Sequence, residues 1–121
     1  MPAPRRAAER DILADILLHI GRGDVRLFRN NVGVLQDRNG QYVNYGLARG
    51  SSDLIGWRTV TITQEMVGQQ LAVFAAIEVK SATGRVSDEQ QNFIDAVIRA
   101  GGYAGVARNI EEAGRILYVE P

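Results

Sequence analysis

The 121-residue chain contains no cysteine, a single histidine and a single lysine. Without cysteine it forms neither disulfides nor thiolate metal sites, which is typical of a protein in a reducing cytoplasm. One histidine also excludes a histidine cluster of the kind that binds zinc. No stretch approaches the roughly 18 consecutive apolar residues of a membrane span. We therefore expect a soluble, cytoplasmic protein with no membrane partner.

Net charge is also absent, because 14 basic residues balance 14 acidic ones. No overall field attracts a polyanion such as DNA. The basic residues are nevertheless unusual, since thirteen are arginines and six of these lie within the first thirty residues. Arginine forms bidentate contacts with phosphate, so local charge permits nucleic-acid binding. A solvated charged surface explains these arginines equally well.

Length and a hydrophobic content of 45% fit one globular domain over residues 1–121. Apolar residues at helical spacing predict a first helix over about residues 7–20. Ser87 with Gln90 forms a capping box that predicts a helix from 88 to about 100, and Asn109 caps a last helix. Extended segments are predicted over residues 25–30, 32–36, 42–47, 53–63, 73–80 and 103–107, with an Asn-Gly turn at 37–40. This order predicts an α/β fold, in which helices flank a mixed β-sheet.

The only lysine, Lys80, ends an apolar run that begins at Val73 and is interrupted by Glu78. Such a run is typical of a strand that is buried on both faces. Side chains two residues apart on a strand point the same way, so Glu78 and Lys80 share a face. A carboxylate and an ammonium are costly to bury unless they are paired or bound to metal. The sequence therefore predicts a functional site at the end of this strand.

A second carboxylate, Asp53, follows Gly50-Ser51-Ser52 and opens the preceding β-rich segment. If that strand pairs with the strand ending at Lys80, Asp53 and Glu78 converge. Two carboxylates and a main-chain carbonyl form an all-oxygen site, which favours Mg²⁺ or Mn²⁺ over Zn²⁺.

Two further polar residues, Gln90 and Glu9, occupy helix positions that are predicted to face the core. For Gln90 a capping role is a sufficient explanation. For Glu9 the helix dipole stabilises a carboxylate in the first turn. An inward position near a catalytic edge is the alternative for both residues.

These residues belong to an ordered string of motifs: Arg29-Asn30-Asn31-Val32-Gly33, Tyr45-Gly46-Leu47, Gly50-Ser51-Ser52-Asp53-Leu54-Ile55-Gly56, Ile77-Glu78-Val79-Lys80, Gln90 and Gly101-Gly102. The string resembles the VRR-NUC domain of the PD-(D/E)xK nuclease superfamily, over about residues 7–118. It is similar to the small free-standing form found in bacteriophages and prophages. The resemblance implies a restriction-endonuclease-like core, similar to that of Holliday-junction resolvases.

The resemblance also implies roles for individual residues. The implied catalytic residues are Asp53, Glu78, Lys80 and Gln90. The implied metal ligands are Asp53, Glu78, the carbonyl of Val79 and, as the first-helix acid, Glu9. The candidate DNA-binding residues are Arg29, Tyr45, Ser52 and Arg85, although a solvated turn explains Arg85 equally well.

The implied activity is that of an endonuclease, which hydrolyses DNA phosphodiester bonds with Mg²⁺ or Mn²⁺ and selects branched, junction or flap DNA. A homodimer in the cytoplasm of a bacterial host is the implied state. Lys80 either orients the attacking water or takes its proton, and the sequence leaves both roles open. The alternative is a non-catalytic DNA-binding or assembly module that retains the fold. Two clustered acids would repel DNA in such a module, which favours the enzyme.

Overall fold

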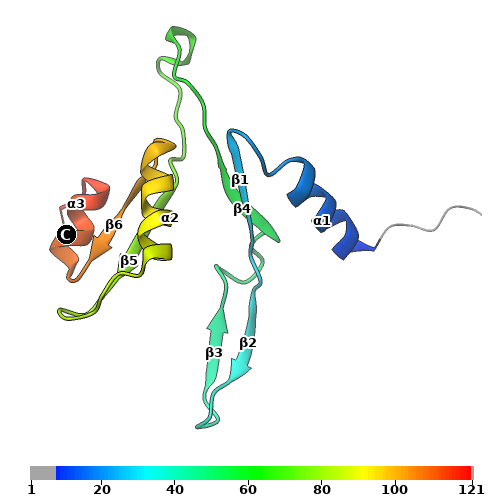
Figure 1. Ribbon diagram of the computed structural model, residues 1–121, viewed down its shortest axis with the longest axis vertical. Coiled ribbons are helices and arrows are strands. Elements are labelled where there is room, and N and C mark those ends of the chain that lie inside the picture. Colours follow the sequence, from blue (N-terminus) through cyan, green and yellow to red (C-terminus); the bar gives the residue numbers. More distant parts are fainter. Residues whose placement is uncertain (1–7, 121) are drawn as a thin grey trace, which may run out of the picture. The chain divides into compact units, whose positions relative to one another are not determined.

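The computed structural model describes residues 8–120 (Figure 1). The chain divides into two compact units, the first ending at Arg58 and the second beginning at Thr59. The expectation of one domain over residues 1–121 stays a prediction. No helix within the described residues is long and apolar enough to cross a membrane.

The described part of the first unit, residues 8–58, contains one helix and four strands. The elements are α1 (Glu9–His19), β1 (Val25–Arg29), β2 (Gly33–Gln36), β3 (Tyr42–Tyr45) and β4 (Leu54–Arg58). Strand β1 pairs antiparallel with β4, with Val25 opposite Arg58 and Arg29 opposite Leu54. Strands β2 and β3 form an antiparallel hairpin. The predicted helix and strands are confirmed with ends shifted by a few residues, and residue 7 lies outside the described part.

The turn of the β2–β3 hairpin is held by Asp37, as the Asn-Gly signal predicts. The Asp37 carboxylate accepts hydrogen bonds from the main-chain N–H groups of Asn39 and Gln41, at 2.8 and 2.9 Å. The Gly40 N–H also donates to the Asp37 carbonyl at 3.1 Å. Local side-chain hydrogen bonds of this kind stabilise turns, which explains why the turn was predictable.

The pairing of β1 with β4 depends on a glycine. A Cβ at Gly56 would lie 1.8 Å from the main-chain oxygen of Arg26 on the neighbouring strand. Only glycine permits so close an approach of two backbones. On the same ribbon, the rings of Phe28 and Trp57 pack with centroids 5.5 Å apart. The strand that follows Asp53 is therefore fixed to β1 by backbone pairing and by aromatic packing.

The second unit is built around a parallel strand pair. Its elements are the 3₁₀ helix η1 (Gln64–Met66), β5 (Ala75–Val79), α2 (Asp88–Arg99), β6 (Tyr103–Ala107) and α3 (Ile110–Leu117). In β5 and β6, Ala75 lies opposite Tyr103 and Glu78 opposite Val106. Helices α2 and α3 flank the pair (Figure 1).

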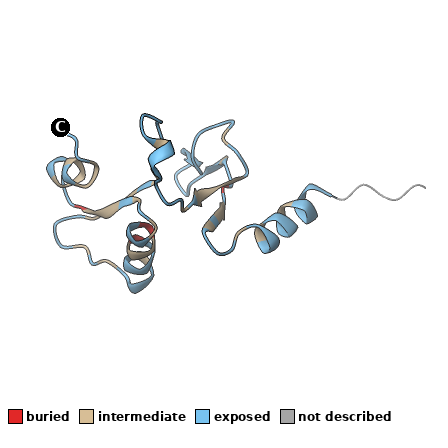
Figure 2. Ribbon diagram, turned by 90° about the horizontal axis from the view of Figure 1, so that it is seen from above, coloured by how far each residue is buried: buried red, intermediate tan, exposed pale blue. Residues whose placement is uncertain are grey.

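The two helices cover opposite faces of the parallel pair. Gln90 of α2 hydrogen-bonds to Glu78, whereas Ile116 of α3 lies over Gly105, where a Cβ would come within 2.9 Å of it. Glu78 lies opposite Val106, and neighbouring residues on a strand point to opposite faces. The buried apolar residues of this unit lie on α2 and at the end of β6 (Figure 2); they are Ile94, Val97 and Ala107.

Both caps of the second unit are confirmed. The Ser87 hydroxyl accepts from the Gln90 N–H at 3.1 Å, and the Gln90 side chain accepts from the Ser87 N–H at 3.0 Å. Asn109 accepts from the Glu112 N–H at 2.8 Å and begins α3. Helices α2 and α3 therefore start where their capping residues predict.

The α/β fold class is confirmed, with strands flanked by helices and both parallel and antiparallel pairing. Within the described residues, the strands form three two-stranded sheets. The prediction that the strand before Lys80 is buried on both faces is wrong. Its last residue, Val79, is 75% exposed, and its central residues are only half-buried. An apolar run does not specify how many neighbouring elements will cover it.

Candidate active site

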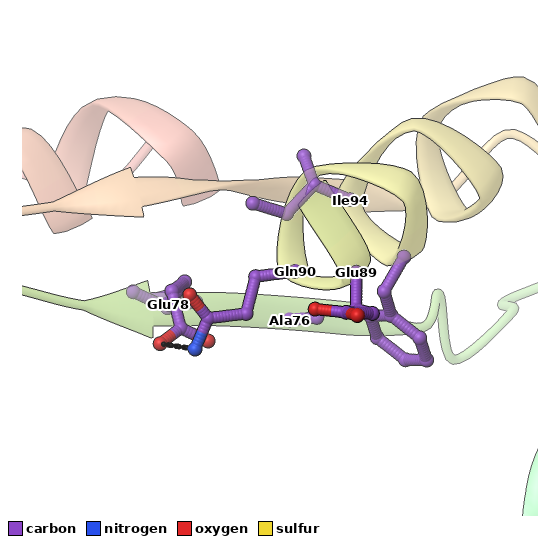
Figure 3. A pocket seen from close by; sticks show the side chains of 7 residues that line it. Ala76, Glu78, Glu89, Gln90 and Ile94 are labelled. Atoms are coloured by element: carbon purple, nitrogen blue, oxygen red, sulfur yellow. Dashed lines mark hydrogen bonds between the residues drawn. The ribbon is translucent and has the colours of Figure 1, made fainter. Parts of the chain in front are cut away.

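Gln90 joins the start of α2 to the end of β5. Its amide nitrogen donates to Oε1 of Glu78 at 2.9 Å (Figure 3). Its amide oxygen at the same time accepts the Ser87 N–H of the capping box. The capping role and the inward role that the sequence left as alternatives are both present. One side chain performs both, because a carboxamide has a donor end and an acceptor end.

Lys80 lies beside the same carboxylate. Its Nζ is 3.6 Å from Oε1 of Glu78, and the side chains are only 20% and 31% exposed. The predicted common face of Glu78 and Lys80 is confirmed. Both contacts use Oε1, so among the contacts of the described residues Oε2 remains available to a further partner. Within residues 8–120 the carboxylate is thus held through Oε1 alone.

A hollow of about 380 Å³ borders this carboxylate. It lies between β5 and the first half of α2, as Figure 3 shows. Its walls are mostly apolar, and its lining residues are Ala76, Ile77, Glu78, Glu89, Gln90, Phe93 and Ile94. An apolar wall strengthens electrostatic interactions at its edge, because it replaces water near the charged groups.

The loop after Lys80 is braced by Arg108, a residue to which the sequence assigned no role. Its guanidinium donates to the carbonyls of Ser81 and Gly84, the latter at 2.8 Å. The Lys80 N–H donates to the Ala107 carbonyl at 3.1 Å, which extends the pairing of β5 with β6. No local sequence signal identifies Arg108, because its partners are 24 and 27 residues away.

Asp53 lies in the first unit, immediately before β4, and is exposed. Its segment is tied to the end of β1 by Asn30, whose amide donates to Ser51 Oγ at 2.8 Å and to the Ser52 carbonyl at 2.9 Å. Asn30 belongs to the motif Arg29-Asn30-Asn31-Val32-Gly33, but no local pattern predicts these contacts, because the partners are 21 and 22 residues away. Since Glu78 belongs to the second unit, the convergence of Asp53 with Glu78 stays a prediction.

The remaining predicted residues are exposed. Arg29, at the end of β1, donates from Nε to Asn31 Oδ1 at 2.8 Å. The Tyr45 hydroxyl lies over Gly33 of the paired strand, where it would be 2.2 Å from a Cβ. Ser52 and Arg85 lie in loops, and Val79 ends β5. Their DNA-binding and ligand roles stay predictions.

Glu9 lies in the first turn of α1, where the helix dipole favours a carboxylate. It is exposed, and none of the residues of α1 is buried. No hydrogen bond or ion pair links Glu9 to Asp53 in the described part of the chain. The position fits the dipole explanation, and the ligand role of Glu9 stays a prediction.

The donors at the expected site are chemically suited to a hard divalent cation. Glu78 offers Oε2, which has no contact among the described residues, Asp53 offers an exposed carboxylate and Val79 a main-chain carbonyl at an exposed strand end. Mg²⁺ and Mn²⁺ prefer such oxygen ligands. Across residues 8–120, no three His, Cys, Asp or Glu side chains gather where they could hold a metal ion. The complete ligand set therefore stays a prediction.

Comparison with known proteins identifies the family. The family model described as VRR-NUC domain matches residues 20–109, about three quarters of the chain. No curated protein and no solved structure matches. The match includes Asp53, Glu78, Lys80 and Gln90 and ends just before α3. The chain therefore belongs to the VRR-NUC family, which has a PD-(D/E)xK-like nuclease fold and a nuclease-type role in DNA processing with DNA as substrate.

Proposed function

We propose that the chain is a divalent-metal-dependent endodeoxyribonuclease that hydrolyses phosphodiester bonds in branched, junction or flap DNA. The proposal is carried by the contact of Glu78 Oε1 with both Gln90 and Lys80. The amide holds the carboxylate oxygen in place beside the ammonium. Charged groups in such a preorganised arrangement can stabilise the charge that develops during a reaction. A module that only binds DNA has no need of this carboxylate, whose charge repels phosphate.

The proposed metal ligands are Asp53, Glu78 and the carbonyl of Val79, with Glu9 as a further acid. Mg²⁺ or Mn²⁺ suits this all-oxygen set. When bound, such an ion supplies positive charge that neutralises the scissile phosphate and lowers the pKa of an adjacent water. Gln90 supports this role because it occupies Oε1 of Glu78 and leaves Oε2 for the cation.

Hydrolysis forms a bond from a water oxygen to phosphorus and breaks one P–O ester bond. The water must lose a proton, and the departing oxygen must gain one. Lys80 is suited to two roles in this reaction. As an ammonium it holds the water or a phosphate oxygen by charge, and as a neutral amine it takes the proton of the water. Both roles require the position beside Glu78 that the ion pair favours.

The homodimer is proposed from the β2–β3 hairpin. Its apolar side chains Val34, Leu35, Tyr42 and Val43 are between 42% and 74% exposed. A two-stranded hairpin alone is only marginally stable in water and gains stability by packing on another surface. Val34 and Tyr42 share one face of the hairpin, because side chains alternate along each strand. The same face of a second copy can pack against them. Two copies would also pool their arginines, which raises affinity for DNA in a chain of zero net charge.

A bacteriophage origin stays a prediction of the resemblance.

The activity is tested with supercoiled plasmid and labelled four-way junctions, in Mn²⁺ or in EDTA. We expect nicking of the plasmid and cutting of the junctions in Mn²⁺ and neither in EDTA. Glu78→Gln preserves the shape of the side chain but removes its charge, so cleavage should fall about 100-fold or more. Glu111→Gln is the matched control, because this exposed carboxylate lies in the first turn of α3. Binding of DNA without metal-dependent cleavage would instead favour the non-catalytic module.

Lys80→Ala is expected to lose cleavage while it retains DNA and metal binding. Removal of a group that transfers a proton or stabilises charge lowers the rate by about 100-fold or more. Cleavage is measured in Mg²⁺, DNA binding by gel shift in Ca²⁺ and metal binding by titration calorimetry. A Lys80→Ala variant that cuts at the wild-type rate would refute the assignment.

Gln90→Glu is expected to separate the two roles of Gln90. A glutamate still accepts the Ser87 N–H, but it replaces the donor to Glu78 with a like charge. We therefore expect cleavage to be lost while α2 remains capped. Ser87→Ala is the matched control, since it removes the cap at a cost of about 1 kcal/mol but leaves the bond to Glu78. Thermal unfolding and cleavage are measured for both variants; wild-type cleavage by Gln90→Glu would contradict the role in holding Glu78.

Light scattering tests the homodimer. We expect a mass of twice the 13.3 kDa of one chain. A charge in the hairpin surface, as in Val34→Glu, should shift the protein toward the single-chain mass. A wild-type protein that is monomeric at assay concentration and still cuts junctions symmetrically would count against this state.

A further inference from the structure

Asn30 is a buried polar residue in the first unit, with 8% of its surface exposed. It follows directly after the last residue of β1, Arg29. A buried carboxamide requires partners, because an unsatisfied polar group in the interior costs about 1–3 kcal/mol. Its partners therefore show what the residue holds in place.

Among the described residues, the hydrogen-bond partners of Asn30 lie in one segment, residues 47–53. The side-chain amide nitrogen donates to Ser51 Oγ at 2.8 Å and to the Ser52 carbonyl at 2.9 Å. The side-chain oxygen accepts the Leu47 N–H at 3.0 Å. The main-chain N–H of Asn30 donates to the Asp53 carbonyl at 2.7 Å. The segment from Gly46 to Asp53 contains no helix or strand of its own, so these bonds are an important source of its order.

Two of these bonds fix the peptide groups on either side of Asp53. The Ser52 carbonyl belongs to the peptide group before the Asp53 Cα, and the Asp53 carbonyl belongs to the peptide group after it. Peptide groups are planar, so holding both restricts the two backbone dihedral angles of Asp53. These bonds therefore restrict the direction of the Asp53 Cα–Cβ bond, from which the carboxylate extends.

We propose that Asn30 is a positioning residue that orients the Asp53 carboxylate for a divalent cation. Its side-chain amide holds the peptide group before Asp53, and it adds to the main-chain bond that holds the peptide group after Asp53 and that persists in Asn30→Ala. The inference rests on the proposed function, in which Asp53 is a metal ligand. Residues that orient metal ligands typically change metal affinity or activity by about 10–100-fold when they are mutated. Asn30 does not touch the carboxylate itself, so it acts through the backbone of Asp53.

The test uses the full chain with Asn30→Ala, at a temperature where circular dichroism shows it folded. Mn²⁺ binding, measured by electron paramagnetic resonance of the free ion, is expected to weaken about tenfold or more. Without metal, amide hydrogen exchange in residues 47–53 is expected to rise. Asn44→Ala is the matched control, since Asn44 is exposed in β3, and it should leave both measurements unchanged.

A double-mutant cycle with Asp53→Ala separates positioning from general destabilisation. If Asn30 acts through Asp53, Asn30→Ala will not weaken Mn²⁺ binding further once Asp53 is removed. Fully additive effects, or wild-type Mn²⁺ affinity in Asn30→Ala, would overturn the inference while the proposed function stands. Wild-type affinity in Asp53→Ala would overturn both, because Asp53 would then not be a ligand.

Asn30→Asp decides the question if Asn30→Ala does not fold. It keeps an oxygen that can accept the Leu47 N–H, but it replaces the amide donor to Ser51 Oγ and to the Ser52 carbonyl with a second oxygen. A loss of Mn²⁺ affinity is expected, together with faster exchange in residues 51–53. Unchanged affinity in a folded Asn30→Asp variant would overturn the inference.

Discussion

The hydrogen bond from Gln90 to Glu78 is the interaction on which the candidate site of the second unit depends. It links the first turn of α2 to Glu78, the next-to-last residue of β5. The same Gln90 side chain completes the helix cap. The start of the helix and the position of the carboxylate are therefore coupled. Lys80 adds charge beside an oxygen that is already held, so the ammonium meets a carboxylate with one defined orientation.

Both units use a carboxamide to hold an acid-bearing segment. Gln90 contacts the acid itself, whereas the Asn30 amide holds the peptide group before Asp53. A carboxamide donates and accepts at once and carries no charge. It can thus order a segment without changing the charge of the site. At Glu78 the only formal positive charge among the described contacts therefore comes from Lys80.

The sequence predicted much of the fold where the determining contacts are local. The capping box of Ser87 and Gln90 gave the start of α2, Asn109 gave the start of α3, and the alternation of side chains placed Glu78 and Lys80 on one face. The prediction that β5 is buried on both faces was wrong. An apolar run shows that a segment is hydrophobic, but it does not show how many neighbouring elements will cover that segment. The roles of Arg108 and Asn30 were missed for a related reason, since their partners are 17 to 27 residues away.

The sequence by itself determined the caps, the Asp37 turn, the strand periodicity and the motifs of the VRR-NUC family. The caps, the turn and the periodicity depend on residues within a few positions of one another, where chain geometry limits the choices, and the family is identified by the order of its short motifs along the chain. Only the tertiary structure decided that the Gln90 amide reaches Glu78 and that Asn30 reaches Ser51 and Ser52. Such contacts form when packing brings distant segments together, and neither donor nor acceptor reveals its partner in the sequence.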